Sequence, residues 1–140
     1  MRKLTLFPRM GNANFKHLEE IASKKLPETF IEFMESNAGL SHYERYYITI
    51  ETIWEVHSFN RYINMFELFE EFISEGWGKM LPFAIDPGGW HFCLCMEDKD
   101  YGAIYVNRWT DYLPENQFLK ISESFEEFIN SLKTDEVIDL

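Results

Sequence analysis

The chain has 140 residues, of which 46% are hydrophobic and 17% aromatic, and its formal net charge is −11. This length and apolar content suit a domain with a hydrophobic core and exclude an intrinsically disordered chain. The charge argues against nucleic acids and anionic membrane surfaces as ligands, because binding to both depends on Lys and Arg. A basic protein is the natural partner.

Two further features of the composition concern the cellular compartment. No window approaches the roughly 18 to 20 consecutive apolar residues of a membrane span, and the apolar run near Met1 is too short for a signal peptide. Cys93 and Cys95 lie two residues apart on one predicted strand, where a disulfide between them would distort the backbone. We therefore expect a cytoplasmic protein.

The first part of the chain predicts two helices and then two strands. Apolar residues at helical spacing indicate a helix over 14–22. Pro27 suits the first turn of a second helix, and Gly39 is a reasonable stop for it. Alternating apolar residues then predict strands over 46–50 and 52–59.

The rest of the chain predicts a third helix, several strands and a closing helix. Asn64 and Glu67 have the spacing of a capping box, and so do Ser124 and Glu127. The closing helix carries an apolar stripe at i, i+3, i+4 and i+7. Four strands are expected between these helices, over residues 81–85, 91–96, 103–108 and 117–120.

This order of elements predicts the α+β class. We expect a single domain over residues 1–140, with a mainly antiparallel sheet of about five to six strands packed against about four helices. The acidic residues 135–140 should form a frayed tail.

The segment between the two central strands reads as a tight turn. Pro87 presets its entry, and Gly88 and Gly89 permit positive φ angles. We interpret the turn as structural. It is not a phosphate-binding loop, because no Gly-Lys-Ser/Thr follows the glycines.

Metal binding has one candidate set, His91, Cys93 and Cys95, which alternation places on one strand face. Residues two apart on a strand are about 6.5 to 7 Å from each other, too far for thiolates that share a zinc ion without a bulge. We favour buried apolar cysteines and expect no metal and no cofactor.

Catalysis has little support in the sequence. There is no Gly-x-Ser-x-Gly or His-Glu-x-x-His motif, although an acid–base pair assembled by the fold stays open. We therefore predict that the protein is not an enzyme.

A predicted hairpin loop carries Glu97, Asp98 and Asp100. Calcium binding is conceivable, but the EF-hand spacing is absent, and a solvated acidic turn is the better interpretation. Glu97 and Asp98 are also candidate contacts for a basic partner.

Two further sets combine aromatic and charged residues, as binding hot spots do. The first is Tyr43, Glu44, Arg45 and Tyr47, which alternatively form a half-buried strand. The second set lies beside predicted turns and comprises Trp90, Trp109, Asp111 and Tyr112. We expect at least one of these two sets to be substantially exposed.

Several segments, in this order, resemble the SUKH superfamily, which includes fungal cell-wall assembly regulators and many bacterial toxin-immunity proteins. They are Leu26–Met34, Asn37–Gly39, Leu81–Leu94, Gly102–Tyr105 and Ser124–Ile129. Two positions depart from the family pattern: Ala38 replaces a glycine, and Trp90 stands where a small polar residue is usual. The residues that carry the structural signature are Pro27, Gly39, Pro82, Asp86, Gly88, Gly89, Phe125 and Phe128.

The resemblance implies an immunity protein that binds and neutralises the toxin domain of a polymorphic toxin system, often a nuclease. An acidic protein suits this role, because a nuclease is basic where it holds phosphates. An intracellular regulatory adaptor like the fungal members is the alternative, and an enzyme is a weaker one. The sequence leaves open the oligomeric state and which toxin is bound.

Overall fold

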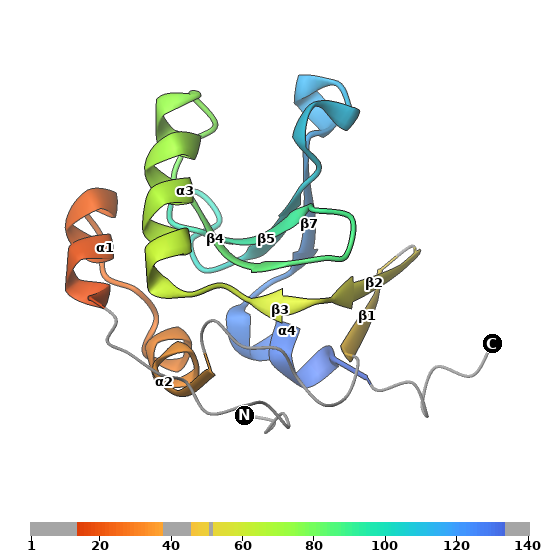
Figure 1. The fold of residues 1–140 in the computed structure, drawn as a ribbon, viewed down its shortest axis with the longest axis horizontal. Coiled ribbons are helices and arrows are strands. Elements are labelled where there is room, and N and C mark those ends of the chain that lie inside the picture. Colours follow the sequence, from red (N-terminus) through yellow and green to blue (C-terminus); the bar gives the residue numbers. More distant parts are fainter. Residues whose placement is uncertain (1–13, 38–45, 51, 134–140) are drawn as a thin grey trace.

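The computed structural model describes residues 14–37, 46–50 and 52–133 (Figure 1). This part of the chain forms four α-helices, a five-stranded antiparallel sheet and a separate two-stranded sheet, which confirms the predicted α+β class. The helices are α1 (Phe15–Ala22), α2 (Glu28–Asn37), α3 (Tyr62–Ser74) and α4 (Phe125–Ser131). The strands are β1 (Tyr46–Ile50), β2 (Thr52–Val56), β3 (Ser58–Phe59), β4 (Met80–Ile85), β5 (His91–Cys95), β6 (Ile104–Asn107) and β7 (Phe118–Ser122).

Two helices begin at side-chain caps. The Asn14 side chain accepts a hydrogen bond of 3.1 Å from the His17 N–H at the start of α1. Ser124 Oγ accepts one of 3.1 Å from the Glu127 N–H at the start of α4, where the capping box was predicted. Each cap gives a side-chain acceptor to an N–H group in the first turn of its helix.

Two predicted boundaries were wrong, both around β3. The strand predicted over residues 52–59 is divided, because β2 pairs with β1 whereas β3 pairs with β4. Helix α3 begins at Tyr62 and not after Asn64, with Arg61 at its N-cap and no side-chain capping bond. The Asn60 N–H donates to the Phe83 carbonyl at 2.7 Å, so the chain enters α3 directly from the sheet.

The main sheet has the order β3-β4-β5-β6-β7, so every strand pairs with its neighbour in sequence. Helices α2 and α4 lie on one side of it and α3 on the other (Figure 1). The α2–α4 side holds the aromatic core, in which Phe83 contacts Phe30, Phe125 and Phe128 at centroid distances of 5.8, 5.3 and 5.6 Å. These four side chains are almost completely buried, which makes this side the stable centre of the fold.

The side that faces α3 carries His91 and Cys93 of β5. The His91 ring lies 6.1 Å from the Phe72 ring of α3. Cys93 and Cys95 are free and buried, and burial raises the pKa of both thiols. Among the described residues, no group of three His, Cys, Asp or Glu is placed to hold a metal ion.

The described signature residues lie at turns and in the core. Pro27 precedes α2, and its carbonyl accepts from the Phe30 N–H at 3.1 Å. Pro82 lies at the β-bulge of β4, and its carbonyl accepts from Asn60 Nδ2 at 3.1 Å. Gly39 and the tail 135–140 lie outside the described residues. In the part of the chain that the structure describes, none of the helices is long and apolar enough to cross a membrane.

Candidate partner-binding surface

Residues 108–117 connect β6 to β7 and are called here the 108–117 loop. Consecutive antiparallel strands can be joined by two residues, so the sheet does not require a connection of this length. The loop forms two short 3₁₀ helices, η1 (Trp109–Asp111) and η2 (Pro114–Asn116). An elaborated loop on a rigid sheet is a common place for binding residues.

Buried polar groups fix the base of the loop. Asn107 Oδ1 accepts hydrogen bonds of 2.9 Å from both the Trp109 N–H and Gln117 Nε2. The Arg108 N–H donates to the Gln117 carbonyl at 2.8 Å, and Arg108 Nη2 donates to the Asn116 carbonyl. Asn107 and Gln117 are both buried, so the bond between their side chains is shielded from water.

The turn between β4 and β5 provides the second support. Asp86 Oδ1 accepts from the Gly88 and Trp90 N–H groups, each at 2.9 Å. Gly89 has a φ of 96°, in the left-handed region that glycine adopts most readily. Gly88, which could also have adopted a positive φ, does not lie in that region. Asp86 therefore organises the turn, which is called here the Asp86 turn.

Two indole groups tie the loop to the Asp86 turn. Trp109 Nε1 donates to the Gly89 carbonyl at 2.8 Å, and Trp90 Nε1 donates to Asp111 Oδ2 at 2.7 Å. The register of β5 and β6 explains this contact. His91, the first residue of β5, pairs with Asn107, the last residue of β6, so the residues just before β5 and just after β6 are neighbours. The structure thus brings together all four residues of the second predicted set.

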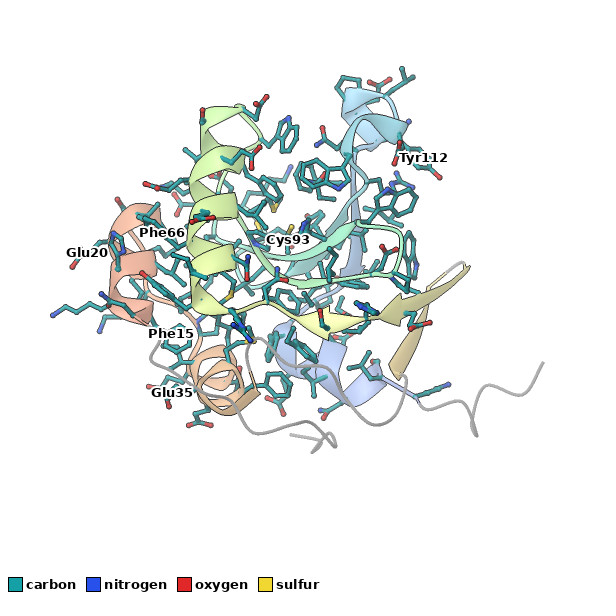
Figure 2. The ribbon with its side chains drawn as sticks, viewed as in Figure 1. Phe15, Glu20, Glu35, Phe66, Cys93 and Tyr112 are labelled. Atoms are coloured by element: carbon teal, nitrogen blue, oxygen red, sulfur yellow. The ribbon has the colours of Figure 1, made fainter. Side chains whose placement is uncertain are left out.

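The members of that set face in different directions. Trp109 packs against Phe72, Trp77 and His91, at centroid distances of 5.5, 5.6 and 5.6 Å. Trp90 instead packs 5.8 Å from Tyr112, and the Arg108 guanidinium lies 3.8 Å from the Tyr112 ring centre. Figure 2 labels Tyr112 on this loop.

Exposure separates the two tryptophans from the outer residues. Trp90 and Trp109 are half-buried, whereas Asp111 is exposed. Tyr112 is 44% exposed and Leu113 is 64% exposed. The second set is therefore accessible at Asp111 and Tyr112, and its tryptophans hold these residues in place.

The other predicted contacts lie elsewhere. Tyr43, Glu44 and Arg45 are outside the described residues, and only the backbone of Tyr47 is described, in β1. Glu97 is half-buried, and its carboxylate accepts from the Lys79 N–H at 2.8 Å. Asp98 is exposed and pairs with Lys24. Sequence reasoning alone did not single out Leu113 or Asn107, although Leu113 belongs to the long connection visible between the strands.

The region beneath Trp109 favours a neutral histidine. Burial lowers the pKa of His91, and this effect outweighs the opposing influence of the Ala84 backbone and of Asp86. Within the described residues, three buried side-chain nitrogens of β5, β6 and the base of the loop have no hydrogen-bond partner: His91 Nδ1, Asn107 Nδ2 and Arg108 Nε. A proton on His91 would therefore add charge to a site that already stabilises charge poorly.

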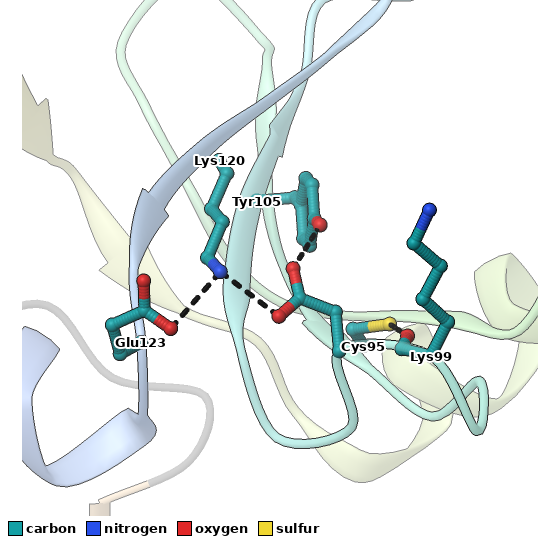
Figure 3. A network of polar contacts seen from close by, with 6 residues as sticks. Cys95, Lys99, Tyr105, Lys120 and Glu123 are labelled. Atoms are coloured by element: carbon teal, nitrogen blue, oxygen red, sulfur yellow. Dashed lines mark hydrogen bonds and ion pairs between the residues drawn. The ribbon is translucent and has the colours of Figure 1, made fainter.

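The polar side chains of a network on β6 and β7 form ion pairs and hydrogen bonds with one another. Lys120 Nζ lies 2.9 Å from Asp100 Oδ1 and 3.0 Å from Glu123 Oε2, and the Tyr105 hydroxyl donates to Asp100 (Figure 3). Hydrogen bonds from Lys120 and Tyr105 lower the pKa of Asp100. Burial and the Asp100 hydrogen bond raise the pKa of Tyr105 to about 12. The network links the strands and the 96–103 turn, and its charges largely satisfy one another.

Comparison with known proteins shows the family of this chain. Residues 12–131 match the SMI1/KNR4 family (SUKH-1). The chain belongs to this family. The match spans every described helix and strand from α1 to α4, so the 108–117 loop and the Asp86 turn lie inside the SUKH-1 domain. No curated protein matches the chain in sequence.

Membership of SUKH-1 bears on the class of function. The family fits an immunity or a regulatory role, is associated with protein–protein interaction and is not known for enzymatic activity. The loop geometry is compatible with such a role, because it presents side chains on a fixed support.

Proposed function

We propose that the protein is a cytoplasmic immunity protein that binds and neutralises a basic toxin domain, such as the nuclease domain of a polymorphic toxin system. The observation that carries this proposal is SUKH-1 membership in a chain with a net charge of −11. A nuclease holds phosphates with Lys and Arg, so an acidic protein can cover its cleft or bind beside it.

Inhibition of this kind needs binding only. An interface of ordinary size covers about 800 Å² on each partner, with an apolar or aromatic centre and a charged rim. The predicted contacts are Trp90, Trp109, Asp111 and Tyr112 on one part of the surface. Further predicted contacts are Tyr43, Glu44, Arg45, Tyr47, Glu97 and Asp98.

The test uses the purified chain and the toxin domain encoded by the gene adjacent to its own. We expect submicromolar binding at moderate salt and stoichiometric inhibition of the toxin's activity. Added salt should slow association strongly and change dissociation less, because charge steers the encounter. Absence of submicromolar binding would overturn the proposal, and association that is insensitive to salt would exclude steering.

A regulatory adaptor like the fungal members is the second candidate, since the SUKH-1 match fits it equally. An assay of cell protection distinguishes the immunity function from the adaptor function. Coexpression with the toxin domain rescues growth if the chain is an immunity protein, and does not if it is an adaptor for another protein.

A further inference from the structure

The exposed apolar side chains are not evenly spread. Five large hydrophobic side chains in the described part of the chain are exposed, and of these only Tyr112 and Leu113 are adjacent in sequence. Ile63 and Ile73 lie apart on α3, and the Tyr101 hydroxyl donates to the Lys25 carbonyl. The tip of the 108–117 loop is therefore the best-defined apolar anchor for a partner.

This tip is ordered before any partner arrives. Fixing a backbone residue costs about 1 to 2 kcal/mol of conformational entropy. Here that cost falls on folding, because Asn107, Gln117 and the two indole hydrogen bonds hold the loop. A preordered contact loses less free energy when it binds.

The charge beside the anchor is negative. Asp111 is exposed and makes no ion pair with any residue that the structure describes, while its Oδ2 is held by the Trp90 indole. Arg108, the cation of the same loop, is engaged with the Tyr112 ring and the Asn116 carbonyl. Together with the net charge of −11, this arrangement favours a cationic partner group next to an apolar one.

We propose that Asp111, Tyr112 and Leu113 form the surface that contacts a basic protein, with Asp111 pairing with a Lys or Arg of the partner and the other two residues supplying the apolar anchor. Asn107, Trp90 and Trp109 are positioning residues that hold this surface. The assignment rests on the proposed function and identifies the partner as the basic toxin domain.

Two contact variants test the assignment against the toxin domain encoded beside the gene. Tyr112→Ala combined with Leu113→Ala should weaken binding by roughly tenfold or more, mainly through faster dissociation. Asp111→Asn keeps the oxygen that accepts from Trp90, and should slow association and flatten its salt dependence. The matched control is Ile63→Ala, an exposed apolar residue on α3, which should bind as the wild type does.

The positioning role has its own readout. Trp90→Phe keeps an aromatic ring but removes the N–H that holds Asp111. We expect faster amide exchange in residues 109–112 and weaker toxin binding, with the exchange change present even without toxin. Unchanged exchange would show that Trp90 does not hold the loop.

The outcomes separate this proposal from the proposed function. A wild-type chain that fails to bind the toxin overturns both. A wild-type chain that binds, while the double variant and Asp111→Asn bind equally well, overturns the surface assignment and leaves the immunity function standing.

Discussion

The Asp86 turn shows how one residue's backbone geometry supports the loop next to it. Gly89 has a φ of 96° and no atom within 4 Å of an added Cβ, so a side chain there meets backbone strain without a clash. Gly88 lacks the positive φ, and an added Cβ would lie 3.5 Å from Asp86 Oδ1, an ordinary contact. The two adjacent glycines therefore differ in what they require.

This difference gives a paired prediction. Gly89→Ala should lower the free energy of unfolding by about 1 to 2 kcal/mol, because a non-glycine residue is strained at this φ. Gly88→Ala should change it by less than about 0.5 kcal/mol. Urea unfolding of both variants measures the difference, and equal losses would contradict the assignment.

His91 predicts a pH dependence of stability. Burial holds its pKa below the ordinary value, so the folded state favours the neutral ring. Its contribution is complete above the unfolded pKa of about 6.5 and is lost as the pH falls through the folded-state value. The wild type should therefore lose more stability than His91→Gln between about pH 7.5 and pH 5.

The comparison with the variant removes the effects of the many carboxylates, which titrate in both proteins. His57→Gln, which removes an exposed histidine between β2 and β3, controls for the loss of a histidine as such. If wild type and His91→Gln have parallel stability curves, His91 does not carry the dependence.

Tyr105 gives a second titration prediction. Its pKa is raised to about 12, first by burial and then by its hydrogen bond to Asp100. Asp100→Asn should lower that pKa and leave it above 10, because burial remains. Phenolate absorbance followed with pH, with Tyr105→Phe to identify the signal, measures the shift, and no shift would show that the carboxylate has no effect.

Among the elements, β4 carries the central core residue. Phe83 is fully buried between Phe30 of α2 and Phe125 and Phe128 of α4. Phe83→Ala should lower the free energy of unfolding by about 3 to 5 kcal/mol, because it removes apolar contacts and leaves a cavity. Ile63→Ala, on the exposed face of α3, should change it by less than about 0.5 kcal/mol in the same unfolding experiment.

Local signals identified the elements better than their boundaries. Ser124 caps its helix through a bond to a residue three positions later, so sequence spacing was enough to find it, whereas the similar cap at Asn14 was not predicted. The start of α3 and the break between β2 and β3 depend on pairing with β4, a contact across the fold. Such contacts override a local capping pattern such as that at Asn64.

The sequence predicted several residues of the candidate surface but not how the fold arranges them. Trp90 and Trp109 were placed beside turns, yet only the register of β5 with β6 brings them together. The roles of Asn107 and Leu113 depend on burial and exposure in the folded protein. Knowledge of that single register would have placed the two tryptophans side by side.

At the scale of the whole molecule, negative charge is in excess. The chain has 24 Asp and Glu residues against 13 Lys and Arg, and the described ion pairs use only Lys24 and Lys120. Mutual repulsion should destabilise the folded state at low ionic strength. Raising NaCl from about 20 to 500 mM should therefore raise the melting temperature, because the Debye length shortens from roughly 20 Å to below 5 Å.

NaCl should therefore have two opposite effects. It should raise the melting temperature of the free protein and slow the association of the protein with a basic partner. A melting temperature that falls with NaCl would show that the described ion pairs outweigh the repulsion. Na₂SO₄ is unsuitable as the salt, since sulfate also strengthens apolar burial.

The strand order of the main sheet has a consequence for the newly made chain. Because each strand of the main sheet pairs with its sequence neighbour, the sheet can grow as the polypeptide leaves the ribosome. Phe30 of α2 nevertheless packs 5.1 Å from Phe125 of α4, a helix made almost a hundred residues later. Until α4 has emerged, the nascent chain exposes aromatic surface, and this interval is when chaperones would bind it.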